Sequence, residues 1–163
     1  MNTVFVSVGS NIEREKNIRL GVDALRECYG VLQLSSVYQS RAVGFAGDDF
    51  YNMVLSFESD LPVTVVAATL REIEMRYGRV RCCEKFSART LDLDILLFGD
   101  EDYRGEDMDI PRAEIEANAH VLQPLAELVP KQLHPLSGVS YQQLWQQFKA
   151  PEQSLWVVPF GWD

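Results

Sequence analysis

The sequence contains few cysteines, few histidines and no long apolar run, and each shortage excludes a class of protein. Its three cysteines are an odd number and two of them, Cys82 and Cys83, are adjacent, so we expect no disulfide framework and a reducing, cytoplasmic location. Two histidines and no Cys-x-x-Cys leave little material for a zinc site. No apolar stretch reaches the roughly 20 residues that a membrane helix needs, and no cationic region precedes an apolar one at the N-terminus. We therefore expect neither a membrane span nor a signal peptide.

Positive charge is also scarce, except in one segment. The net charge of −9 disfavours a general nucleic-acid-binding protein, because an acidic surface repels phosphate backbones. Between Arg76 and Arg89, however, five Arg and Lys residues accompany a single acid, Glu84. Like charges this close repel each other and are stabilised by a bound anion, so the segment is a candidate phosphate site. The alternative is a solvated loop with ordinary surface ion pairs.

Length and composition indicate one packed domain over residues 1–163, with 47% hydrophobic residues and neither a repeat nor a linker. The order strand, helix, two strands, helix, strand predicts an α+β fold: a ferredoxin-like β-α-β-β-α-β sheet with helices on one face, followed by an α-rich C-terminal extension. The expected strands are 3–8, 31–38, a half-buried 50–58, and 91–98. The expected helices are 13–28 and 62–77, then a short helix over 111–123 and another short amphipathic helix that includes Leu136, Tyr141, Leu144, Trp145 and Phe148. A loop is expected over 39–49, a turn or hairpin tip over 100–109, and a tail with Trp156 and Trp162 that packs back.

Two aspartates lie two residues apart within the apolar run 91–98. Side chains alternate along a strand, so Asp92 and Asp94 share one face, with Cα atoms about 6.5–7 Å apart. Aspartate is disfavoured in strands, and these two directly follow the basic segment. Together they predict a site for magnesium and a polyphosphate. Two solvated aspartates on an exposed strand face are the alternative.

The motif Arg89-Thr90-Leu91-Asp92-Leu93-Asp94-Ile95-Leu96-Leu97-Phe98-Gly99 resembles the signature of the 6-hydroxymethyl-7,8-dihydropterin pyrophosphokinases. The resemblance extends over most of the chain. It also includes Val8-Gly9-Ser10-Asn11, Ser35-Ser36-Val37-Tyr38, Phe50-Tyr51-Asn52, Gly78-Arg79-Val80-Arg81 and Gln123-Pro124-Leu125.

This resemblance implies a ferredoxin-like fold and the transfer of pyrophosphate from ATP to the pterin hydroxymethyl group, with release of AMP, in folate biosynthesis. It implies that Asp92 and Asp94 hold two magnesium ions, while Arg79 and Arg89 stabilise the transferring phosphates. The implied contacts with ATP are Arg71, Glu74, Arg81, Lys85, Phe86, Ile95 and Arg112; those with the pterin are Ser40, Val43, Phe50, Asn52 and His120. Such chemistry agrees with the residues, because phosphoryl transfer needs positioning and charge neutralisation more than a covalent catalyst.

The chain departs from the family pattern in several places. Lys85-Phe86-Ser87-Ala88 stands where Arg-Trp-Gly-Pro is usual, and Lys loses the bidentate phosphate contact of Arg. Ser40-Arg41-Ala42 replaces a more rigid Thr-Pro-Pro, and Arg112 replaces a histidine after Pro111. Asn118 stands for an arginine, and His120 stands for a pterin-stacking phenylalanine. His120 could stack and titrate near neutral pH, or it could be an ordinary surface histidine.

These departures keep other functions open. A divergent paralogue would act on another pterin. A binding module would hold nucleotide or pterin without turnover. An RNA-binding ferredoxin-like domain lacks support, because its aromatic strand pattern is missing and the chain is acidic. The expected partners are ATP and a pterin, without nucleic acid or membrane, and the expected state is a monomer.

Overall fold

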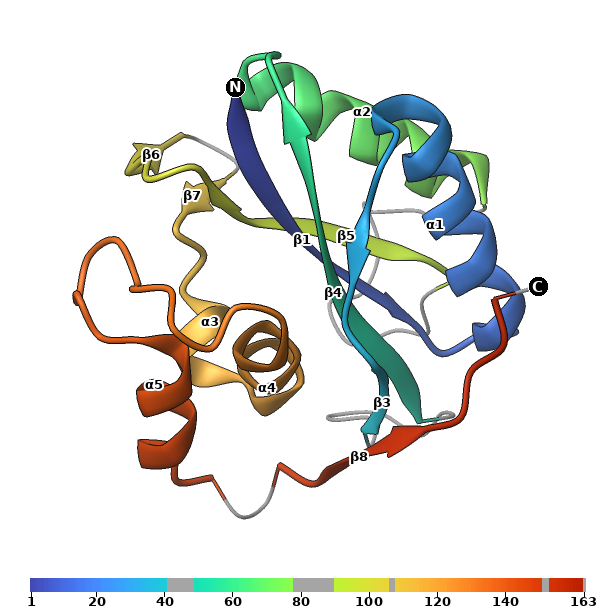
Figure 1. Cartoon of the computed structure of the whole chain (residues 1–163). Helices are drawn as coiled ribbons and strands as arrows, with labels where there is room; N and C mark the ends of the chain where they lie inside the picture. The colour runs from blue at the N-terminus through green and yellow to red at the C-terminus, as the bar shows by residue number, and fades with distance from the viewer. Residues whose placement is uncertain (41–48, 78–89, 106–107, 151–152, 163) are drawn as a thin grey trace.

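The computed structural model describes residues 1–40, 49–77, 90–105, 108–150 and 153–162, and it combines one large antiparallel sheet with helices on both of its faces (Figure 1). This confirms the predicted α+β class. The elements follow the chain as β1 (Asn2–Ser10), α1 (Arg14–Tyr29), β2 (Gln33–Leu34), β3 (Val37–Ser40), β4 (Phe50–Ser59), α2 (Val63–Arg76), β5 (Asp92–Phe98), β6 (Tyr103–Arg104), β7 (Asp109–Ile110), α3 (Glu114–Ala117), α4 (Ala119–Leu128), α5 (Tyr141–Gln147) and β8 (Leu155–Val158).

The large sheet has the strand order β5-β1-β4-β3-β8, and β2 also pairs with β4. Strand β1 lies inside the sheet and runs antiparallel to both of its neighbours, β4 and β5. β6 and β7 form a separate small hairpin, as the sequence predicted for residues 100–109. The register places Gly9 of β1 opposite Asn52 on one side and opposite Asp92 on the other. Residues far apart in the sequence thus form one row across the sheet.

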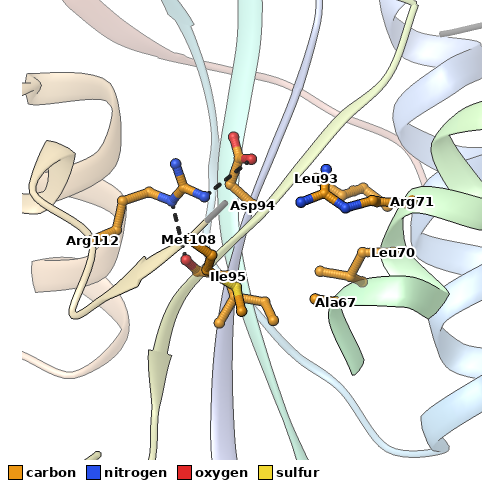
Figure 2. Close-up of a pocket in the computed structure, with 8 residues that line it drawn as sticks. All are labelled: Ala67, Leu70, Arg71, Leu93, Asp94, Ile95, Met108 and Arg112. Carbon is orange, nitrogen blue, oxygen red and sulfur yellow. Dashed lines mark hydrogen bonds and ion pairs between the residues drawn. The ribbon is translucent and has the colours of Figure 1, made fainter. Parts of the chain in front are cut away.

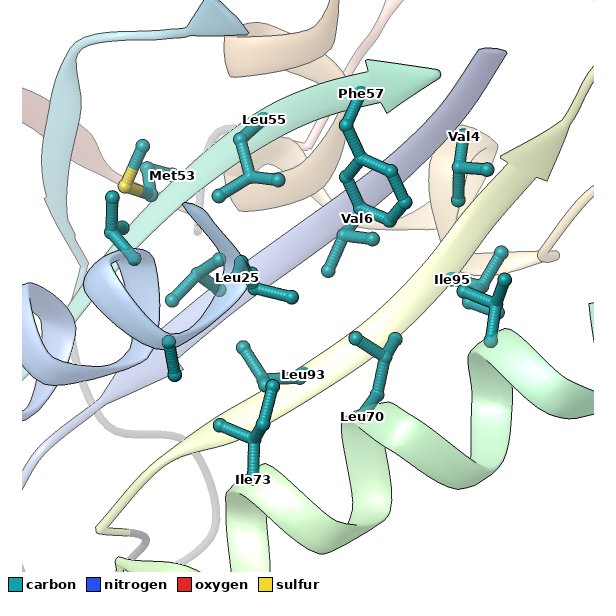
Figure 3. Packing of buried hydrophobic residues seen from close by; sticks show 14 of the residues in the cluster. Val4, Val6, Leu25, Met53, Leu55, Phe57, Leu70, Ile73, Leu93 and Ile95 are labelled. Atoms are coloured by element: carbon teal, nitrogen blue, oxygen red, sulfur yellow. The ribbon is translucent and has the colours of Figure 1, made fainter. Parts of the chain in front are cut away.

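Alternate residues of the central strands pack against α1 and α2 on one face of the sheet (Figure 3). From the strands come Val4, Val6, Met53, Leu55, Phe57, Leu93 and Ile95, and from the helices come Leu25, Leu70 and Ile73. A second cluster on the opposite face joins Phe5, Val54, Leu96 and Leu97 to α3, α4 and α5. The C-terminal helices, for which the sequence pattern predicts no particular face, cover this second face.

This second layer corrects the prediction that strand 50–58 is half-buried. Val54 and Ser56 are as buried as their neighbours, because α4 covers the face that was expected to be polar and solvated. Small polar residues on that face are buried beneath a helix.

The helix expected over 111–123 is also corrected. It consists of α3 and α4, separated by the extended backbone of Asn118, and α4 continues through Pro124 to Leu128. Proline removes one helical hydrogen bond, which is why the sequence predicts that the helix ends before Pro124. Burial of Val121, Leu122 and Leu125 in the second cluster offsets that loss.

The tail does pack back, but as strand β8 paired with β3 rather than through its tryptophans. Trp156 and Trp162 stay 43% and 37% exposed, while Phe160 contacts the core residue Tyr51 edge-on. Within the ranges described, no helix has both the length and the apolar character needed to cross a membrane.

Candidate active site

Strand β5 places Asp92 and Asp94 on the same face of the sheet, as predicted, while Leu93 and Ile95 enter the core on the other. Both aspartates are half-buried. An oxygen of Asp94 lies 3.5 Å from a guanidinium nitrogen of Arg112, and each of these side chains is 24% exposed. The Asp94 carboxylate is therefore partly open to solvent and within reach of a ligand, whereas one side-chain oxygen of Asp92, Oδ1, is buried.

The row across the sheet contains a gap beside Asp92. Gly9 lies between Asp92 and Asn52, and a Cβ at that position would approach the Asn52 side-chain oxygen to 3.0 Å. Asn52 is 8% exposed and donates from Nδ2 to the hydroxyl of Ser40 at 2.8 Å. Phe50 lies opposite Ser40 in the β3–β4 register. The missing side chain leaves bare backbone between a carboxylate and a fixed amide, which suits a flat polar ligand.

A cavity of about 370 Å³ adjoins Asp94, between α2 and the edge of β5 (Figure 2). Figure 2 shows Arg71 on one side of Asp94 and Arg112 on the other. The residues that line it are Ala67, Leu70, Arg71, Leu93, Asp94, Ile95, Met108 and Arg112. The structure thus brings together three of the predicted ATP contacts, Arg71, Ile95 and Arg112, with one of the predicted metal ligands.

Arg112 is held in place at this cavity by the edge of β5. Its backbone N–H donates to the Leu96 carbonyl at 3.0 Å, and its Nε donates to the Ile95 carbonyl at 3.2 Å. The guanidinium also lies 3.6 Å from Glu114. These contacts fix a positive charge beside Asp94 before any ligand binds.

Glu74 lies on the buried side of α2 and is 1% exposed. Its Oε2 accepts from the Leu93 N–H at 2.7 Å, which ties α2 to the aspartate-bearing strand. This hydrogen bond gives the predicted ATP contact a structural role within the protein, and its contact with ATP stays a prediction.

His120 is in the first turn of α4 and is half-buried, and its contact with a pterin stays a prediction. Burial lowers its pKa, while the carboxylates of Asp92 and Glu114 act in the opposite direction. A neutral imidazole is therefore favoured, close enough to Asp92 to feel its charge.

Several predicted residues lie outside the described ranges: Val43, Arg79, Arg81, Lys85, Phe86 and Arg89. In contrast, Ala67, Leu70, Leu93 and Met108 line the cavity but were not predicted as site residues. Apolar residues on a helix or next to a strand have the same pattern whether they face a cavity or the core, so no sequence signal distinguishes them.

The donor set fits magnesium better than a structural metal. Among the described residues no group of three or more His, Cys, Asp and Glu side chains converges on one point. Mg²⁺ commonly takes one or two protein carboxylates and completes its coordination with water and substrate phosphates. Asp92 and Asp94, half-buried on one strand face, match that requirement.

Paired carboxylates, two arginines at one cavity, and an open polar row are the features of an enzyme that places a polyphosphate beside a flat substrate. Residues 5–130 match the model of the 7,8-dihydro-6-hydroxymethylpterin-pyrophosphokinase (HPPK) family, so the chain belongs to that family. The 2-amino-4-hydroxy-6-hydroxymethyldihydropteridine pyrophosphokinase of Synechocystis is 37% identical over 131 residues, which are 80% of this chain and 66% of the relative. That of Aquifex aeolicus is 31% identical over 157 residues, 95% of this chain and 94% of the relative.

Solved structures support the same fold. A crystal structure of HPPK-DHPS in complex with substrates superposes with a TM-score of 0.70 over 90% of this chain and 43% of that chain, at 9% identity. Plasmodium falciparum HPPK-DHPS A437G gives a TM-score of 0.71 at 11% identity, over 90% of this chain and 45% of that one. The chain thus spans less than half of these proteins. At such low identity the superposition establishes the fold alone.

Proposed function

We propose that this site transfers pyrophosphate from ATP to the hydroxymethyl group of 6-hydroxymethyl-7,8-dihydropterin, a step of folate biosynthesis. The hydroxymethyl oxygen forms a bond to the β-phosphorus of ATP, the bond from that phosphorus to the α–β bridging oxygen breaks, AMP leaves, and the hydroxyl proton is released. The single observation that carries the proposal is the position of Asp92 and Asp94. Asp94 lines the α2–β5 cavity, and Asp92 lies opposite Gly9 in the row that continues to Asn52, in a chain of the pyrophosphokinase family.

Asp92 and Asp94 would hold magnesium, with two ions proposed. Bound magnesium would neutralise phosphate charge and orient the transferring group. Arg112, fixed at the edge of β5, adds positive charge on the same side. Arg79 and Arg89 are proposed to stabilise the transferring phosphates from the basic segment.

The α2–β5 cavity is the proposed site for the nucleotide. Its apolar walls, Ala67, Leu70, Ile95 and Met108, suit a purine ring, and Arg71 and Arg112 suit phosphate or ribose oxygens. Glu74, Arg81, Lys85 and Phe86 complete the proposed set of contacts with ATP.

The pterin is proposed to lie on the opposite side of the aspartates, over Gly9. The Asn52 amide is oriented by Ser40, so it can pair with the polar edge of the ring. Phe50 and His120 supply aromatic surfaces, and Val43 and Ser40 belong to the proposed pterin loop. His120 stands where the family has a phenylalanine, and a neutral imidazole can form hydrogen bonds that phenylalanine cannot. We therefore propose, as a second candidate substrate, another pterin whose substituents accept or donate a hydrogen bond.

The strand order β5-β1-β4-β3, with all neighbours antiparallel, supports a ferredoxin-like topology with β8 as an added strand. We further propose that the protein acts as a cytoplasmic monomer, without nucleic acid or membrane partners.

The test is to incubate the protein with magnesium, ATP and 6-hydroxymethyl-7,8-dihydropterin and to separate the nucleotides. Pterin-dependent formation of AMP at micromolar pterin is expected. ADP in place of AMP would contradict pyrophosphoryl transfer. Tight binding of both ligands without AMP would identify a binding module instead.

A further inference from the structure

The last described segment, residues 153–162, lies beyond the region that matches the family model, yet it contacts three elements of the proposed pterin side. Figure 1 shows β8 beside β3 and the end of the chain near α1. The contacts are specific enough to assign a role to one residue, Gln153.

Gln153 caps the N-terminus of α4. The first N–H groups of a helix have no partner within the helix, and the side chain of the N-cap residue Asn118 makes no capping hydrogen bond. Instead, Gln153 Oε1 accepts from the Ala119 N–H at 2.8 Å, and its Nε2 donates to the Ala117 carbonyl at 3.0 Å. Ala119 is only 1% exposed, so water cannot readily replace the Gln153 amide.

The helix turn that Gln153 caps contains His120, and the negative charge of Asp92 acts to raise the pKa of its ring. Beyond Gln153, β8 pairs with β3 and places Leu155 opposite Ser40, the hydroxyl that orients Asn52. Phe160 then contacts Tyr51 edge-on, and Arg19 donates to the Gly161 carbonyl at 2.5 Å. Residues 153–162 therefore contact the helix turn that contains His120 and the strand that contains Ser40.

We infer that Gln153 is a positioning residue for the pterin: it orders the first turn of α4 and so holds His120 beside Asp92. This inference rests on the proposed function. The nucleotide cavity is lined by residues of α2 and β5 together with Met108 and Arg112, whereas the Gln153 side chain bonds to Ala119 and Ala117, neither of which lines that cavity. Loss of the cap thus weakens pterin binding selectively.

The experiment compares Gln153→Ala and Gln153→Glu with the matched control Gln146→Ala, an exposed glutamine of α5. The Kd values of the pterin and of a non-hydrolysable ATP analogue are measured with magnesium, well below the melting temperature, along with amide exchange at Ala119 and His120. Gln153→Ala should raise the pterin Kd about 3- to 10-fold, the range expected for a lost helix cap, and speed exchange at Ala119. The analogue Kd should change less than about 2-fold. Gln153→Glu keeps the acceptor but not the donor, so its effect should be intermediate.

A purely structural role would give faster exchange with an unchanged pterin Kd, and a general loss of stability would weaken both ligands equally. Either result overturns the inference. A wild-type protein that neither binds nor converts the pterin overturns the proposed function. A wild type that converts the pterin normally, together with an unchanged Gln153→Ala variant, overturns only the role of Gln153.

Discussion

At the scale of single residues, the site depends on the alternation of side chains along β5. Asp92 and Asp94 point to the ligand side while Leu93 and Ile95 fill the core, so one short strand contributes to both stability and chemistry. The shared face of Asp92 and Asp94 was predictable from the sequence, because the alternation of side chains along a strand does not depend on tertiary contacts. The partner of Asp94, Arg112, was named only by resemblance, since its approach depends on the chain turning back after β7.

Replacing Asp94 separates catalysis from stability. Asp94→Ala removes a proposed magnesium ligand, so turnover should fall at least about 10²-fold in the AMP assay. Its ion pair with Arg112 is partly exposed, so the free energy of unfolding should change by no more than about 1 kcal/mol in urea titrations.

The matched control for this variant is Glu114→Gln, because Glu114 is the other carboxylate beside Arg112, at 3.6 Å. Glu114→Gln should retain turnover within a few-fold. Equal losses of turnover in both variants would contradict the metal role. They would mean that Asp94 acts by neutralising the charge of Arg112.

At the scale of elements, α2 and the edge of β5 together form the nucleotide cavity. The helix and the strand were both predicted within a few residues of their observed bounds. The cavity between them was not, because its apolar walls share the periodicity of core residues. Glu74 illustrates the same difficulty: its buried hydrogen bond to the Leu93 N–H exists only once the helix has docked.

Two neighbouring alanines of α2 test the cavity. Ala67 lines it and Ala68 is exposed to solvent. Ala67→Phe should occupy part of the space proposed for the nucleotide and raise the Kd of the ATP analogue at least about 10-fold by steric exclusion, measured by calorimetry. The pterin-binding row lies on the other side of the aspartates and should be little affected.

Ala68→Phe places the same side chain on the same helix, but in solvent, and should leave nucleotide binding unchanged. If both variants bind the analogue like the wild type, the nucleotide does not occupy this cavity.

At the scale of the whole molecule, the second helical layer is attached to the sheet by a polar contact as well as by its apolar core. Glu127 of α4 accepts from the Ser36 N–H and hydroxyl, each at 2.9 Å, and from the Tyr38 hydroxyl at 2.6 Å. Burial, reinforced by the hydrogen bond to Glu127, raises the pKa of Tyr38 above its ordinary value of 10.0. The position of this layer could not be predicted from the sequence. The spacing of apolar residues shows which side of a helix is buried, but not which face of the sheet that helix covers.

This raised pKa predicts a loss of stability in alkali. The folded state keeps the Tyr38 proton that the unfolded chain releases near its ordinary pKa of 10.0, so the stabilisation is complete below that pH and is lost as pH rises above it. Burial also raises the pKa of Tyr141 and acts in the same direction. Urea unfolding from about pH 9 to about pH 11 should show a falling free energy of unfolding.

Tyr38→Phe should flatten this decline, because it removes one of the three tyrosines whose pKa is raised, Tyr29, Tyr38 and Tyr141, while costing about 1 kcal/mol at neutral pH. An identical pH dependence in the variant would show that the hydroxyl titrates normally in the folded protein.

The irregularity in β5 has a consequence for how this chain can change length. The register between β1 and β5 shifts between Phe5 and Val6, so Leu96 is an extra residue that reverses the alternation, and Leu97 faces the same side as Asp94. A single deletion or insertion between Asp92 and Ile95 would exchange carboxylates for leucines, burying charge and emptying the site in one step. A deletion at Leu96 would leave both aspartates in place and disturb only the packing beyond them. The strand should therefore tolerate no change of length between Asp92 and Ile95, but it should tolerate a deletion at Leu96 better. Functional length variants, natural or engineered, should have their insertions and deletions at Leu96 rather than between the aspartates and Ile95.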